Sequence, residues 1–188
     1  MMLSRNGGSE TALGLVNAVI GIAMFAGSLL ASLMKTPESR VRVICNSLLF
    51  SMSTENFLLA FGRTPLVWCI GGFLGWIAIP LMNANLDAVI RLHTPEEMQG
   101  RVYSVRNSLQ FFTIPIGYLL GGFLVDSVFE PIMVRQKEGS FLLRIFGSGK
   151  GSGAAFLFFL LAFAGIGVCL YFRHDQHIWD LEKEKRSL

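Results

Sequence analysis

Charged side chains are scarce in this chain. Asp, Glu, Lys and Arg make up 15% of its 188 residues, whereas soluble domains carry about 25%. Too few polar side chains are present to cover the surface of an ordinary water-soluble enzyme. Intrinsic disorder is excluded as well, because a disordered chain needs low hydrophobicity and high charge.

Cysteine and histidine are rare, with three residues of each. Cys45, Cys69 and Cys169 lie inside apolar runs, without a CxxC pair or a histidine at metal-ligand spacing. This excludes a disulfide-stapled secreted domain and predicts small buried side chains. The enzyme motifs HExxH, GxSxG and the P-loop are absent. We therefore expect no enzyme, no catalytic residues, no metal site and no cofactor.

Apolar residues dominate what is present. They form 52% of the chain, and 16 Phe and 20 Gly stand against three Tyr. The mean hydropathy is +0.53. Glycine is commoner in membrane helices than in soluble ones. At about 20 residues per span, the chain has room for at most six or seven membrane helices. The lipid bilayer is thus its expected surrounding.

Five apolar segments are each long enough to cross about 30 Å of hydrocarbon, and too long for strands. They cover residues 11–34, 43–62, 65–90, 102–125 and 151–172. The sequence therefore predicts an all-α integral membrane protein with a membrane domain over 1–173. We expect an external loop over 126–150 and a cytoplasmic tail over 174–188. Pro80 and Pro115 each remove a backbone hydrogen bond within a span and permit bends.

The orientation follows from the distribution of Lys and Arg. The connections after the first and third spans, together with the tail, hold ten of the sixteen. Four of the other six lie in the long loop, where this rule is weakest. Because basic residues gather on the cytoplasmic side, we place the C-terminus in the cytoplasm. These charges are expected to fix orientation, and no nucleic-acid partner is expected.

Polar residues inside spans are costly unless they face protein or water, and so they can mark a transport path. The candidates for such a path are Asn83, Asn85, Asp87, Gln110 and Glu55. Glu55 lies about 10 Å from the outer end of the second span at helical rise. It could bind and release a proton there. Alternatively, this ragged span sits shallowly and Glu55 reaches the headgroups.

Charges also cluster where the third and fourth spans meet the predicted cytoplasmic side. Arg91 follows Asp87 at i+4, which places the two on one helical face. An acid that pairs with an Arg of a neighbouring helix could hold the cytoplasmic mouth closed. The gate candidates are Asp87, Arg91, Gly100, Arg101 and Arg106. Ordinary boundary charges are the alternative interpretation.

Small residues recur at four-residue spacing in several spans. In lipid, helices associate largely through close backbone approach over small residues. Ala23, Gly27 and Ala31 form one such run in the first span. The glycines that we expect to pack helices together are Gly71, Gly75, Gly117, Gly121 and Gly122. Chance spacing in a Gly-rich chain is the alternative.

Four stretches of the sequence carry a family resemblance. They read PLMNANLDAVIR (80–91), TPEEMQGRVYS (94–104), PIGYLLGGFLVD (115–126) and VFEPIM (128–133). Together they resemble the C-terminal half of bacterial major facilitator superfamily transporters, in the macrolide-efflux-like branch. The QGRV core at 99–102 and the VFEP run are the most specific pieces. The resemblance extends from about Gly14 into the tail.

This resemblance implies helices eight to twelve of a twelve-helix transporter in the bacterial inner membrane. In that family two six-helix halves rock around a central cavity, typically exporting drugs in exchange for protons. A small hydrophobic substrate would then be shared with the other half. Helix seven and the N-terminal half have no counterpart here, so the chain alone is expected to be inactive. The alternative is a non-transporting membrane protein that oligomerises, or binds a partner, through its helix faces.

Overall fold

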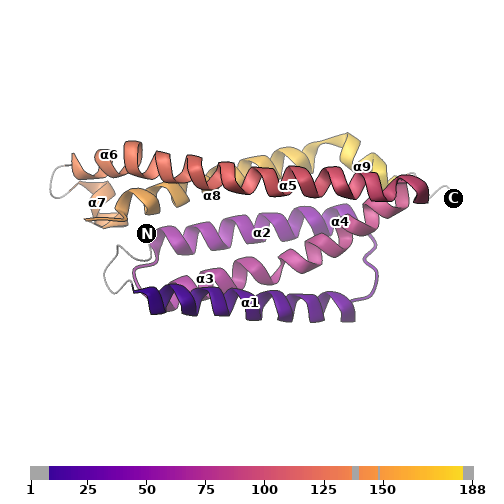
Figure 1. The fold of residues 1–188 in the computed structure, drawn as a ribbon, viewed down its shortest axis with the longest axis horizontal. Coiled ribbons are helices and arrows are strands. Elements are labelled where there is room, and N and C mark those ends of the chain that lie inside the picture. The colour runs from indigo at the N-terminus through magenta and orange to yellow at the C-terminus, as the bar shows by residue number, and fades with distance from the viewer. Residues whose placement is uncertain (1–8, 137–139, 148, 184–188) are drawn as a thin grey trace.

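The computed structural model describes residues 9–136, 140–147 and 149–183, with side chains up to Trp179 (Figure 1). Arg5, Lys137, Lys185 and Arg186, which contribute to the distribution of basic residues, lie outside the described residues. Within the described ranges the chain is helical and contains no β-strand. The elements are α1 (Glu10–Leu33), α2 (Arg40–Phe61), α3 (Pro65–Ile77), α4 (Ile79–His93), α5 (Glu96–Leu124), the π-helix η1 (Val125–Phe129), α6 (Glu130–Val134), α7 (Phe141–Phe146), α8 (Ser152–His174) and α9 (Gln176–Lys183).

Five helical stretches are long and apolar enough to cross a membrane. They are Glu10–Leu33, Arg40–Phe61, Pro65–His93, Glu96–Val134 and Ser152–His174. The predicted all-α architecture is therefore confirmed, together with five helical stretches that are long and apolar enough to cross a membrane. The fourth stretch differs in extent from its prediction. It begins at Glu96 and continues past Val125 to Val134, so part of the expected loop 126–150 is helical.

Local sequence explains where the helices begin. The Ser9 hydroxyl caps α1 by accepting from the Ala12 N–H, and Ser39 caps α2 through Arg42, both at 3.1 Å. Such caps satisfy N–H groups that have no partner inside the helix. Pro65 occupies the first turn of α3, where its missing N–H costs nothing.

The helices pack as layers around α2. α1 lies against α3 and α4, these two pack on α2, and α8 packs on another side of α2. Figure 1 shows this order, from α1 at the bottom to α8 near the top. One apolar cluster joins Val16, Leu59, Trp68 and Cys69. A second joins Ala60, Met133, Phe146 and Ala155, next to a set of Phe rings. The first cluster thus gathers residues of α1, α2 and α3, and the second gathers residues of α2, α6, α7 and α8.

The third span is broken at Ala78, between α3 and α4. Pro80, the second residue of α4, supplies no backbone N–H. Gly27 of α1 lies against the Ile77 carbonyl at this break, and Gly75 lies against Glu55 of α2. Glycine is required at both places because a Cβ atom would occupy the space of the neighbouring helix. The break is thus enclosed by α1 and α2.

Helix α5 stands apart from this packing. It has no buried residue, and its main neighbours are α4 and the η1 segment that follows it. The side chains of Phe111, Tyr118 and Leu119 are 71%, 78% and 74% exposed. Much of a 29-residue helix therefore offers its surface to something other than the described part of this chain.

Candidate functional site

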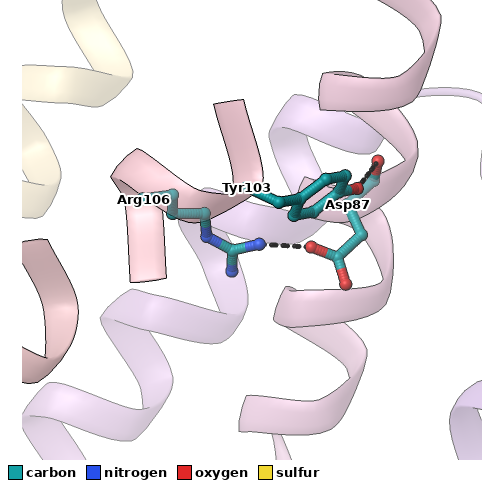
Figure 2. A network of polar contacts seen from close by, with 3 residues as sticks. All are labelled: Asp87, Tyr103 and Arg106. Carbon is teal, nitrogen blue, oxygen red and sulfur yellow. Dashed lines mark hydrogen bonds and ion pairs between the residues drawn. The ribbon is translucent and has the colours of Figure 1, made fainter. Parts of the chain in front are cut away.

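An ion pair joins α4 to α5 near the connection between them (Figure 2). Arg106 donates through Nη1 to Oδ1 of Asp87. Tyr103, one turn before Arg106, donates its hydroxyl to the Asp87 carbonyl oxygen at 3.2 Å. Residues three apart share a helical face, so both α5 side chains converge on one α4 residue. Two helices are thereby held together at one point.

The pair is accessible to solvent. The side chains of Arg106 and Asp87 are 25% and 39% exposed. A partly exposed ion pair contributes about 1 kcal/mol or less, since water screens it. Such a contact can open and close without destabilising the fold.

The other gate candidates do not join this contact. Arg91, Gly100 and Arg101 are exposed, and no ion pair of Arg91 or Arg101 occurs within the described residues. Asp87 pairs with the neighbouring helix rather than with Arg91, its i+4 neighbour. Gln99 supports the turn by donating to the Thr94 carbonyl at 3.2 Å.

The path candidates on α4 point in different directions. Successive positions on a helix are 100° apart, so Asn83 and Asp87 share a face that Asn85 does not. Asn85 is only 4% exposed and donates to the Leu81 carbonyl at 2.8 Å. Asn83 is half-buried, while Gln110 is exposed on α5. The structure therefore does not bring these amides together.

Glu55 lies at the contact between α2 and α3. Its Oε1 accepts a hydrogen bond from Trp76 Nε1 at 3.0 Å, and its Cβ lies beside Gly75. Glu55 also lines a largely apolar pocket of about 480 Å³ between α2 and α8, together with Met52 and Cys169 among others. Glu55 is therefore separate from the Asp87–Arg106 ion pair. Its contacts belong to the packing of α2 against the broken third span.

The predicted packing glycines fall into two groups. Gly71 lies against Leu58, and Gly75 against Glu55, so both bring α3 close to α2. At Gly117, Gly121 and Gly122 of α5, an added Cβ atom would have no other part of the described chain within 4 Å. Their packing role stays a prediction that needs another helix.

A polar contact at the start of α8 was not predicted from the sequence. Glu130 of α6 accepts from the N–H groups of Gly151 and Gly153, at 2.6 and 2.7 Å, and so caps α8. A carboxylate at a helix N-terminus is favourable. The only signal in the sequence is an acid near a Gly-rich stretch, and spacing alone does not pair the two.

Arg63 makes a similar contact that the sequence did not indicate. It donates through Nη2 to the carbonyl oxygens of Arg144 and Ile145, at 2.8 and 3.1 Å. These carbonyls belong to the short helix α7, whose last turn leaves such groups without partners. The contact fixes α7 at the end of α2.

No group of three His, Cys, Asp or Glu side chains suited to a metal ion occurs within the described residues. No protein-family model, curated protein or solved structure matches this chain. The resemblance to a transporter family therefore stays a prediction that rests on the quoted motifs.

Proposed function

We propose that this chain is the C-terminal portion of a membrane permease of the major facilitator type. It works in the bacterial inner membrane, with its C-terminus in the cytoplasm. Its substrates are small hydrophobic molecules such as drugs or macrolides, exported by proton coupling and alternating access. Three observations support this function: the five helices that are long and apolar enough to cross a membrane, the motif resemblance, and the exposed surface of α5.

The observation that carries the proposal is the Asp87–Arg106 pair. It joins two consecutive spans at one end, where a transporter must close one mouth of its path. The pair is partly exposed, so its opening costs little free energy. It is also reinforced from the same face by Tyr103. These properties suit a contact that opens and closes during transport better than a contact that only stabilises the fold.

The exposed surface of α5 supports a transport path that this chain forms together with other helices. A membrane helix gains stability by close packing against other helices. Gln110 lies on the exposed part of α5, and a polar side chain there is costly against lipid. We therefore assign the surface of α5 to further helices that complete the bundle. Transport requires those helices.

Cells that express this chain alone are expected to accumulate erythromycin and ethidium to the level of an empty vector. The neighbouring coding DNA is then searched for a segment with further membrane spans. Joint expression with that segment is expected to lower accumulation several-fold. Asp87→Asn should abolish most of this export, because it removes the charge that Arg106 binds.

Glu96→Gln is the matched control for this assay. It removes a carboxylate near the same end of α5, where Glu96 is exposed and has no ion pair within the described residues. Export should survive it. Export by the single chain, or export by the joined segments that is indifferent to Asp87→Asn, would contradict the proposal.

A second candidate function is oligomerisation without transport, which the glycines of α5 favour. Gly117 and Gly121 form a GxxxG pair with nothing of the described chain close to it. In lipid such pairs associate helices. Thr113 and Gln110 continue the same face by helical spacing, and both are exposed.

Cysteine cross-linking in membranes tests this candidate. In a background where Cys45, Cys69 and Cys169 are replaced by Ala, Gly117→Cys is expected to form disulfide-linked dimers under oxidation. Leu119→Cys is the control, because Leu119 is 74% exposed but lies about 200° around the helix. Monomer alone, or equal dimer at both positions, would exclude this interface.

A further inference from the structure

A second pocket lies between the end of α1, the turn after it and α4. Its volume is about 250 Å³, and it is lined among others by Lys35, Thr36, Arg40, Leu81 and Asn85. The turn joins two consecutive spans. A turn between spans lies at the level of the lipid headgroups. The pocket therefore opens at the boundary of the membrane.

Two cations of this pocket are uncompensated. Neither Lys35 nor Arg40 has an ion pair among the residues that the structure describes. Glu38, the acid of the same turn, is exposed and is not among the lining residues. Asp87 of α4 is already engaged by Arg106. The pocket thus carries a net positive charge that an anion would satisfy.

Hydrogen-bond donors surround the same space. Thr36 contributes a hydroxyl group. Asn85, 4% exposed, lines the pocket and uses one amide N–H for the Leu81 carbonyl, which leaves its second N–H. Arg40 is the first residue of α2, where the helix dipole adds positive potential. An anion with several oxygens in different directions fits these donors better than a planar carboxylate.

We propose that this pocket binds a phosphate group with a net negative charge. Phosphate is the anion that occurs at headgroup depth, and basic pockets between membrane helices bind anionic headgroups. The phosphate can belong to an anionic phospholipid, such as phosphatidylglycerol, or be free in solution. Lys35 and Arg40 supply the charge, while Thr36 and Asn85 orient the oxygens. This site does not depend on transport.

The test uses the purified full chain in a neutral detergent. In one arm, native mass spectrometry compares retained phosphatidylglycerol with retained phosphatidylcholine. In the other, thermal unfolding is followed with inorganic phosphate against chloride at equal ionic strength. One of the two arms is expected to show binding by the wild type, to phosphatidylglycerol or to inorganic phosphate. In that arm the double variant Lys35→Gln/Arg40→Gln is expected to bind the same ligand about 10- to 30-fold more weakly.

Arg42→Gln is the matched control, since Arg42 belongs to the same first turn of α2 but does not line the pocket. It should bind like the wild type. Lys35→Arg/Arg40→Lys keeps both charges and should also retain binding. If the double Gln variant does not fold, Lys35→Gln alone replaces it, because Lys35 is exposed.

Each outcome decides the proposal. A preference for phosphatidylglycerol that the Gln variant loses supports a lipid headgroup as the source. Stabilisation by inorganic phosphate alone, lost in the same variant, supports free phosphate. The proposal is overturned if the wild type binds in neither arm, if the Gln variant binds like the wild type, or if Arg42→Gln weakens binding equally.

Discussion

Gly27→Ala is expected to destabilise the protein by about 2 kcal/mol, within the usual cost of overpacking a well-packed interior. A Cβ atom at Gly27 would overlap the Ile77 carbonyl and lie 3.2 Å from Cδ of Pro80. Neither group can turn aside as a flexible side chain would, because both belong to the backbone or ring of the broken span. Helix α1 would have to move away from α3 and α4.

Gly21→Ala in the same helix is the control. Nothing lies within 4 Å of a Cβ there, and alanine is the better helix former by up to about 1 kcal/mol. The two variants should therefore shift the unfolding midpoint in opposite directions. Thermal unfolding in detergent, followed by circular dichroism, gives both midpoints. Equal shifts would mean that Gly27 is not in a tight contact.

The difference between these glycines marks the limit of sequence reasoning. Gly75 and Gly117 each belong to a GxxxG pair, and the sequence assigns both pairs the same role. In the structure Gly75 contacts α2, whereas Gly117 has no close neighbour in the described chain. The spacing shows that small residues lie on one face of a helix. Only the arrangement of the helices decides which such face has a partner.

The charges near α4 show the same limit. The five spans could be predicted because length and apolar content alone decide whether a helix can cross a membrane. The sequence predicted that Asp87 could pair with an Arg from a neighbouring helix. Arg91, at i+4 on the same helix, was an equally plausible partner. The turn between α4 and α5 brings Arg106 to Asp87. That choice depends on tertiary geometry.

The fourth span extends further than predicted for a related reason. The predicted span ended at Val125, directly before Asp126, and the residues after it were assigned to a loop. The structure continues through the π-helix η1 into α6. Glu130 is stabilised there by two backbone N–H groups of the stretch that begins α8. A charge with such partners need not end a helix.

Glu130→Ala is expected to cost about 3 kcal/mol of stability. Hydrogen bonds to a charged group contribute roughly 1.5–3 kcal/mol each, and the variant loses two of them, less what water recovers. The buried backbone around Gly151 and Gly153 would lose its acceptor, and α8 would fray at its start. Hydrogen exchange should therefore rise first in the opening turn of α8, ahead of global unfolding.

Two further variants separate the charge of Glu130 from its hydrogen bonds. Glu130→Gln keeps one acceptor oxygen and should lose about half as much stability as Glu130→Ala. Asp126→Ala, four residues earlier, removes an exposed carboxylate and should change the unfolding midpoint little. If Asp126→Ala and Glu130→Ala destabilise alike, the loss comes from the charge of this segment. The effect of Glu130 must then be attributed to that charge, since the cap on α8 would not account for it.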